Sequence, residues 1–360
     1  MIIYSLRDAD PLPLCAFLLT SLLLLFSCDG VPESMESDNP PCFNVELKLG
    51  DIPGTRATNV QLSDEGRVNR WSLCVYRVSD GLLAATGSSE SGASIACTLP
   101  AGAYRAAAFV NPPHSGPGVF DPSSSLTGET PAAQAAYLSD NAAGALEMYG
   151  TEEFSLDTGP ESIAIRASRL VSKVVLRKVT LRLSDSGLAA SPFTLDAIYL
   201  DNVPSRTTWG ADYDFDGLDV DRSRWYNAMG WHKEGSCQSP ACPDAILGDR
   251  IGTIIAQGQT YQTEHVFYAV PNPTPASQDT RSATWAKRAT RLVIEARIGS
   301  QTQYYVASLP QMRRNHSYVI EEAVITGLGA GDPELETPNS LELFFSVSDD
   351  GWEDGGTIIL

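Results

Sequence analysis

The feature that most constrains the fold of this chain is the strict alternation of apolar and polar residues in short runs. In FNVELKL, residues 43–49, the apolar positions are Phe43, Val45, Leu47 and Leu49. A period of two places these four side chains on one face of an extended strand. The run therefore predicts a strand with one buried face.

Similar runs recur along the chain, separated by turn residues. No segment carries a confident long helical pattern, and Gly 29 and Pro 23 imply many turns. Many short strands between turns favour an all-β fold over an α/β enzyme. Further strands are expected at residues 70–78, 81–87, 94–99, 103–111, 147–156, 162–167, 168–183, 193–203, 264–270, 290–299, 302–309, 317–327 and 340–347.

The length of the chain predicts more than one domain. A chain of 360 residues allows two domains of ordinary size once a leader is set aside. We expect a boundary near residue 185, with one β-sandwich over 57–185 and a second over 186–360. A polar, tryptophan-containing insertion is expected over 204–258.

Residues 1–27 have the pattern of an export signal. The apolar run from Leu12 to Phe26 is about fifteen residues long, which is too short for a helix that crosses a bilayer. Its end, LFSC at 25–28, looks like a bacterial lipobox, in which Cys28 carries a lipid and the chain is cut before it. Such a lipid would tether the protein to a membrane. A buried N-terminal helix and a plain signal peptide with an incidental cysteine are the alternatives.

The segment after Cys28 and the overall charge point to the outside of a cell. DGVPESMESDNPP, residues 29–41, is acidic and has no periodicity, which predicts a flexible leash. The formal net charge of -19 argues against a nucleic-acid partner and against charge-driven binding to anionic lipid.

The cysteines allow disulfides but do not have the spacing of a zinc site. An exported protein can form disulfides, and Cys237 and Cys242 could close a short loop. Cys74 and Cys97 lie in expected strands, where they could form a bridge or remain buried thiols. No CxxC pair or neighbouring histidine completes a zinc ligand set. Of the five cysteines after Cys28, the remaining one is Cys42.

The sharpest candidate for a cation site is DYDFDGLDVD, residues 212–221. It matches the D-x-D-x-D-G start of a calcium loop, in which Gly217 supplies the turn. The twelfth position, however, is Ser223 rather than a bidentate glutamate, and flanking helices are not expected. A solvated acidic turn is the alternative. The ligands of such a calcium site would be Asp212, Asp214, Asp216, Asp219 and Asp221.

No catalytic arrangement can be assembled from the sequence. The histidines are scattered, and no Ser/His/Asp or Cys/His set is evident. We therefore predict that the protein is not an enzyme. The four histidines are His114, His232, His265 and His316.

Four short motifs follow one another along the chain: GTRA (54–57), SRLVSKVVL (168–176), LPQMRRNHSYVIEEAVITGLG (309–329) and SVSDDGWEDG (346–355). Their order resembles that found in the fimbrillins of Bacteroidetes, the subunits of type V pili. After the first strand, Gly54-Thr55-Arg56-Ala57 resembles the junction at which such precursors are cut after arginine. SRLVSKVVL (168–176) resembles the family's arginine-led strand. LPQMRRNHSYVIEEAVITGLG (309–329) resembles its RN-x-x-Y hairpin, and SVSDDGWEDG (346–355) resembles its terminal strand. With the lipobox, these motifs span most of the chain.

The resemblance implies a fold and an assembly mechanism. The fold would be two transthyretin-like (Ig-like) β-sandwich domains in tandem. An arginine-specific protease would cut between Arg56 and Ala57 and remove residues 28–56, which include the strand at 43–49. The C-terminal strand of a neighbouring subunit would then fill the open groove. Its donor residues would be Leu341, Leu343, Phe345 and Val347, or Ile358, Ile359 and Leu360.

The resemblance also implies a function. The protein would be a structural subunit of a cell-surface fimbrium that serves adhesion. It would reach the outer membrane through the lipid on Cys28, need no other cofactor, and join other fimbrial subunits head to tail. The alternatives are a fimbrial tip or anchor subunit, and a monomeric surface lipoprotein that binds glycan or calcium. The strand at 43–49 could also be an ordinary edge strand, and Arg56 could lie in an uncut loop.

Overall fold

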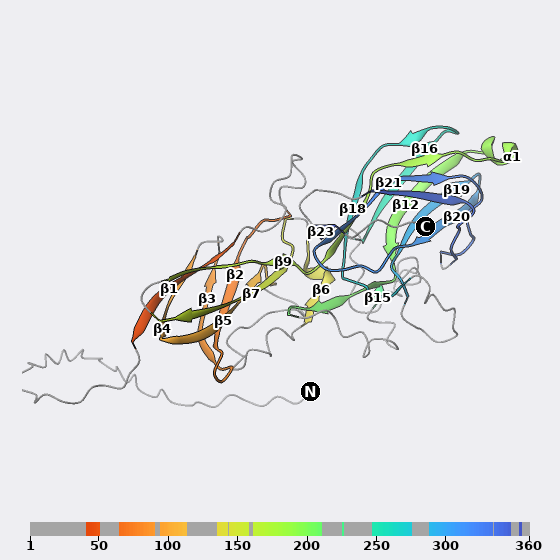
Figure 1. Cartoon of the computed structure of the whole chain (residues 1–360). Helices are drawn as coiled ribbons and strands as arrows, with labels where there is room; N and C mark the ends of the chain where they lie inside the picture. The colour runs from red at the N-terminus through yellow and green to blue at the C-terminus, as the bar shows by residue number, and fades with distance from the viewer. Residues whose placement is uncertain are drawn as a thin grey trace, which may run out of the picture. The chain divides into compact units, whose positions relative to one another are not determined.

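A computed structural model shows a chain built almost entirely of β-strands (Figure 1). The helices in the described residues are α1 (Ser186–Ala189) and the 3-10 turn η3 (Leu138–Asp140). Neither they nor any other described segment forms a helix long and apolar enough to cross a membrane. The all-β prediction is confirmed. The structure describes residues 41–50, 65–90, 94–113, 135–142, 144–157, 161–210, 225–226, 247–275, 288–333, 335–346 and 353–354.

Two sheets from the first half of the chain share one core, and we call them the N-terminal sheets. Val45 and Leu99 contribute to it from the first sheet, and Leu73 and Ala106 from the second. Two sheets that bury their inner faces together form a β-sandwich. The first sheet has the order β4 (Ile95–Pro100), β1 (Cys42–Leu49), β8 (Glu161–Ile165). The second has the order β3 (Leu83–Ser89), β2 (Trp71–Arg77), β5 (Gly102–Val110), β7 (Met148–Leu156), β9 (Ser168–Arg169).

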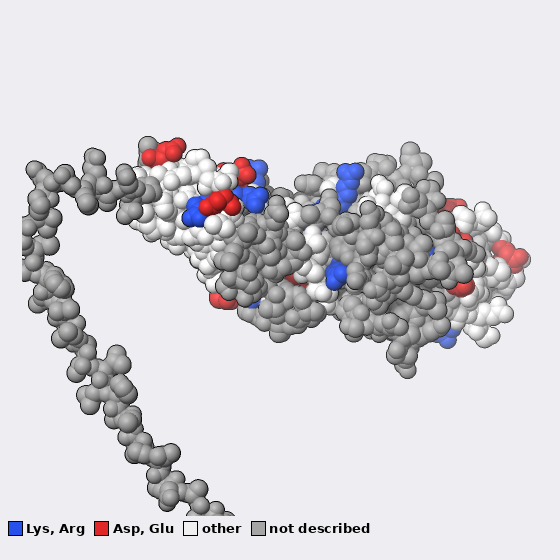
Figure 2. Space-filling view, turned by 90° about the horizontal axis from the view of Figure 1, so that it is seen from below, with Lys and Arg blue, Asp and Glu red and all other residues white. Residues whose placement is uncertain are grey.

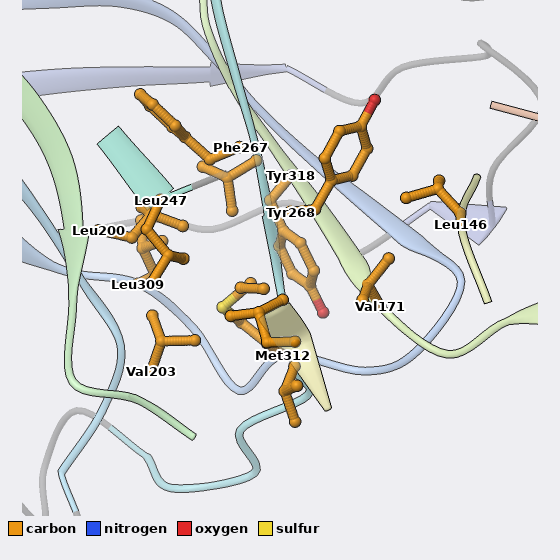
Figure 3. Packing of buried hydrophobic residues seen from close by; sticks show 14 of the residues in the cluster. Leu146, Val171, Leu200, Val203, Leu247, Phe267, Tyr268, Leu309, Met312 and Tyr318 are labelled. Carbon is orange, nitrogen blue, oxygen red and sulfur yellow. The ribbon is translucent and has the colours of Figure 1, made fainter. Parts of the chain in front are cut away.

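Two further sheets, which we call the C-terminal sheets, are built in the same way. Val174 and Ile320 of one sheet and Ile198 of the other lie in the same apolar cluster as the core residues of the N-terminal sheets. Figure 3 shows part of this packing, around Leu200 and Phe267. The seven-stranded sheet runs β17 (Thr260–Tyr261), β11 (Val179–Leu181), β21 (His316–Ile325), β10 (Ser172–Leu176), β18 (His265–Ala269), and β22 (Leu341–Ser346) and β23 (Glu353–Asp354) also pair with β21. The four-stranded sheet runs β16 (Gly248–Ile255), β12 (Phe193–Asp201), β19 (Arg291–Ile298), β20 (Gln301–Ser308).

Two short ribbons complete the described strands. β13 (Val203–Pro204) pairs with β15 (Trp225–Tyr226), and β14 (Arg206–Thr208) pairs with β6 (Ala135–Tyr137). The second ribbon joins segments that lie far apart in the sequence. β13, β14, β15 and β16 lie wholly or partly in the region predicted to be a polar insertion, so that prediction is wrong for the described parts of 204–258. β16 is not predicted from the sequence, because GDRIGTII does not alternate between apolar and polar residues.

The prediction of one strand over 168–183 is also wrong. This run forms β9, β10 and β11, which belong to two different sheets. β9 pairs with β7, whereas β10 and β11 pair with β21. All five residues of β10 are buried, as expected for a strand inside a sheet that is covered on both faces. A continuous apolar run does not reveal such a change of sheet. The domain boundary near residue 185 and the tandem arrangement stay predictions.

Candidate functional site

The first candidate for a functional site is β1, the strand that the sequence marks as removable. Val45 and Leu47 are 1% and 0% exposed. Phe43 and Leu49 are partly buried against the same core. The polar residues between them face outward. β1 therefore has the single buried face that its alternation predicts.

Backbone hydrogen bonds hold β1 on both of its edges. It runs antiparallel to β4, with Phe43 opposite Leu99, and parallel to β8, with Leu49 opposite Ile165. Beyond its end, the Gly50 N–H donates to the Ile165 carbonyl at 2.8 Å. β1 is thus the central strand of its sheet, and the alternative of an ordinary edge strand is wrong.

The outer face of β1 contributes little to holding it. Ser94 Oγ donates to Glu46 Oε1 at 2.6 Å, and Thr98 Oγ1 donates to Asn44 Oδ1 at 2.9 Å, both in exposed positions. Figure 2 shows acidic and basic side chains side by side on one face of the molecule. Exposed polar pairs of this kind add little stability. The strand is therefore held by its backbone bonds and its buried side chains.

The second candidate for a functional site is β22, near the C-terminus. Leu341 is 7% exposed, and Leu343 and Phe345 are partly buried against the core. Phe344 points away from the core and is 50% exposed. The predicted alternation is confirmed over these residues, but the inward face is less deeply buried than that of β1.

β22 is an edge strand in the part of the chain that the structure describes. It pairs antiparallel with β21, from Ile325 opposite Leu341 to Val319 opposite Ser346. Its other edge pairs with no described strand.

A groove of about 440 Å³ lies between β22 and β20. Its wall is mostly apolar, and it leaves this side of β22 partly uncovered. Leaving β21 would break one row of backbone bonds. The groove is lined by Val306, Ala307, Ser308, Glu336, Pro338, Leu341, Glu342, Leu343 and Phe344.

Most of the other residues that the sequence singles out lie outside the described residues. The lipidation, cleavage, calcium and outermost donor positions therefore stay predictions, as does any disulfide of the last two cysteines. The residues concerned are Cys28, Arg56, Ala57, Asp212, Asp214, Asp216, Asp219, Asp221, Val347, Ile358, Ile359, Leu360, Cys237 and Cys242.

The buried Cys74 does not support nucleophilic chemistry. Cys74 and Cys97 are free thiols, so the possible bridge between them is not formed. Burial raises the pKa of the Cys74 thiol to about 11, which keeps it protonated near neutral pH. Within the described ranges, no three His, Cys, Asp or Glu side chains are grouped so that they could hold a metal ion.

One buried carboxyl group was not suggested by the sequence. Glu147 lies just before β7 and is 0% exposed, and its Oε2 accepts a hydrogen bond from Asn141 Nδ2 at 3.1 Å. Burial, helped by the negative charge of Asp140, raises the pKa of Glu147 to about 8. The burial of Glu147 cannot be predicted from its neighbours in the sequence, because it depends on contacts with distant segments.

No protein-family model matches the sequence, and no curated protein is similar to it in sequence. Solved structures do match its fold. A candidate cell adhesion protein from Bacteroides eggerthii has 17% identity and a TM-score of 0.59, over 87% of this chain and 97% of that one. One from Parabacteroides distasonis has 16% identity and a TM-score of 0.55, over 88% and 98%. A fimbrilin from Porphyromonas gingivalis has 14% identity and a TM-score of 0.51, over 83% and 94%. The chain therefore has the fold of these proteins.

Proposed function

We propose that this chain, which has the fold of a fimbrilin, is a structural subunit of a cell-surface fimbrium and polymerises by donor-strand exchange. The observation that carries the proposal is the central position of β1 between β4 and β8. β1 ends at Leu49, and the arginine at which we expect the chain to be cut, Arg56, follows soon after.

Cutting after Arg56 would free β1 from the rest of the chain. Its departure would leave two rows of unpaired backbone groups, on β4 and on β8, and would open the space that Val45 and Leu47 fill. Burying a Val or Leu side chain contributes roughly 1.5–3 kcal/mol. An open groove of this kind would bind another strand strongly.

The strand that fills the groove would come from residues 341–360 of a neighbouring subunit. In β22, Leu341, Leu343 and Phe345 alternate as the inward residues of β1 do. Leaving β21 would break one row of hydrogen bonds, whereas entering the groove would form two. Backbone pairing would supply affinity, and the alternate side chains would supply fit. Ile358, Ile359 and Leu360 are the alternative donor residues.

This contact joins two different surfaces of neighbouring subunits, so it does not close on itself and builds a filament. The lipid on Cys28 would hold the precursor at the outer membrane until an arginine-specific protease removes residues 28–56. The partners are then other fimbrial subunits, in a homopolymer or heteropolymer. Because the subunit carries its own donor strand, we favour a role in the shaft over one at the tip. The fimbrium would serve adhesion.

N-terminal sequencing of protein sheared from cells tests the processing step. We expect a start at Ala57, and ladders of oligomers on gels run in mild SDS. Protein that starts at Cys28 and runs only as a monomer would overturn the proposal.

Two neighbouring residues of β22 test the donor strand. Phe345→Asp would place a charge in the space that β1 leaves between β4 and β8 of the next subunit, and it should abolish the ladder. Phe344→Asp places the same charge on the outward face and should leave the ladder intact. If both variants form ladders, β22 is not the donor, and Ile359→Asp then tests the alternative segment.

A further inference from the structure

Glu65, the first described residue after Arg56, is buried among charged and polar groups. Its side chain is 2% exposed. Glu65 Oε2 accepts a hydrogen bond from Lys173 Nζ at 3.2 Å, and Oε1 accepts one from the Tyr268 hydroxyl at 2.6 Å. The backbone carbonyl of Glu65 accepts a hydrogen bond from Arg169 Nε at 3.1 Å. The segment that leads into β2 is therefore held by both its side chain and its backbone.

Arg169 extends this network to the turn before β21. It is fully buried, and its Nη1 donates to Asn315 Oδ1 at 3.2 Å. The Asn315 N–H donates in turn to the Val171 carbonyl at 2.9 Å. Asn315 has a φ of 57°, in the left-handed region that Asn tolerates better than most residues. Arg169 comes from the motif at 168–176 and Asn315 from the motif at 309–329.

These five residues connect the N-terminal sheets to the C-terminal sheets. Glu65 leads into β2 and Arg169 lies on β9, both in the five-stranded sheet. Lys173 lies on β10, directly opposite Tyr268 on β18, in the seven-stranded sheet. Asn315 immediately precedes β21 of that sheet. We call the set Glu65, Arg169, Lys173, Tyr268 and Asn315 the Glu65 joint.

The Glu65 joint stabilises the observed contact between the N-terminal sheets and the C-terminal sheets. The Lys173 side chain is 0% exposed, so its charge is stabilised by the carboxylate that faces it. A buried ion pair adds little net stability compared with apolar residues, but removing one partner is strongly destabilising. Separating Glu65 from Lys173 would also be strongly destabilising, unless water reached both charged groups.

We propose that the Glu65 joint transmits tension between the two ends of the subunit in a filament. The inference rests on the proposed function. In such a filament, one neighbour pulls on β4 and β8, and the other pulls on the C-terminal segment that leaves β21. Between these points, residues 170–171 connect β9 to β10 along the chain. The joint provides a non-covalent path beside that connection, and it holds Glu65 itself in the chain that remains after the cut.

Hydrogen exchange on the uncut precursor tests the joint without requiring a filament. Glu65→Gln keeps an acceptor for Tyr268 but removes the charge that faces Lys173. We expect exchange of the Asn315 amide to become faster by roughly a hundredfold, because the joint opens more often. Amides of β12 and β19 should keep their rates.

Two further variants serve as controls. Glu321→Gln makes the same change in an exposed ion pair with Arg177, and it should leave exchange at Asn315 unchanged. Adding Lys173→Met to Glu65→Gln removes the positive charge that faces position 65 and should restore most of the protection. Equal exchange at Asn315 in Glu65→Gln and Glu321→Gln would overturn the proposal. Uniformly faster exchange that includes β12 and β19 would also overturn it, because it would indicate a general loss of stability.

Shearing of filaments then tests the transmission of tension. Glu65→Gln should form the same ladder as the wild type, but its filaments should break into shorter pieces under equal shear. Equal lengths after shear would contradict the proposal. If the wild type forms no ladder, the proposed function fails, whereas the exchange experiment still decides whether the joint exists.

Discussion

β1 and β22 have the same alternating pattern but are held in different ways. In β1, Val45 and Leu47 are almost completely buried, whereas Leu343 and Phe345 of β22 are only partly buried. β1 is hydrogen-bonded along both edges. β22 is bonded along one edge in the described part of the chain, and a groove lies beside it.

The difference teaches that alternation determines which side chains face inward but not how firmly a strand is held. A central strand must break two rows of bonds and uncover a core before it leaves, whereas an edge strand breaks one row. β1 would therefore leave only after a cut in the chain and with a replacement strand available. β22 needs neither condition. This asymmetry would give strand exchange its direction.

The largest expected effect comes from making β1 impossible to remove. Asn44 and Thr98 lie directly opposite each other on β1 and β4, so Asn44→Cys with Thr98→Cys should allow a disulfide across the pair. Under oxidising conditions the cut subunit should form no ladder, because β1 stays in its groove. Reductant should restore the ladder, and Asn44→Cys alone should form it under both conditions. A ladder from the oxidised double variant would contradict the exchange of β1.

The next largest effect compares the same truncation in the two strands. Leu47→Ala should lower the unfolding free energy of the uncut precursor by roughly 2–5 kcal/mol, because it empties a fully buried site. Leu343→Ala should lower it by only about 1 kcal/mol, since Leu343 is partly buried. Urea unfolding of the two precursors measures both values. Equal losses would show that β22 is held as firmly as β1.

A smaller effect is expected on the pH dependence of the unfolding free energy, through the buried Glu147. The pKa of Glu147 in the folded N-terminal sheets is about 8, above its ordinary value of 4.5. Between these values the unfolded chain releases this proton while the folded chain keeps it, so stability falls as pH rises from 4.5 to 8. Glu147→Gln should remove a loss of roughly 1–4 kcal/mol over this range. Urea unfolding at pH 5 and pH 8 measures it.

The exposed Glu152, on the neighbouring strand β7, offers a matched control for this pH effect. Glu152→Gln should retain the pH dependence of the wild type. If Glu147→Gln retains it too, the raised pKa of Glu147 is contradicted.

The smallest effect is expected on the outward face of β22. Phe344 is half exposed, so Phe344→Ser should change the unfolding free energy by less than about 1 kcal/mol. It should also leave the ladder unchanged. A large loss of stability, measured by thermal unfolding, would mean that the outward face of β22 is covered.

The strands themselves were largely predictable, because alternation is a local property. Most of the expected strands appear within a few residues, β1, β12 and β19 among them. The exceptions are instructive. β16 lacks alternation, and β10 is buried on both faces, so periodicity did not mark where the chain changes sheet.

The candidate site was only half predictable. The inward residues of β1 and β22 follow from the sequence, but the central position of one and the edge position of the other do not. The Glu65 joint could not be predicted from the sequence either, because Lys173 and Tyr268, which donate hydrogen bonds to Glu65, lie far from it along the chain. Asn315 and Arg169 each lie in a motif, but the sequence does not show that the two side chains form a hydrogen bond.

The sequence by itself determined that the chain is built of short strands and which face of β1 and of β22 turns inward. A period of two is enough for that, since each side chain's direction depends only on its neighbours along the chain. Only the tertiary structure decided that β1 has two strand neighbours and β22 has one. Pairing is a choice among distant segments, and many segments of this chain have the same local pattern.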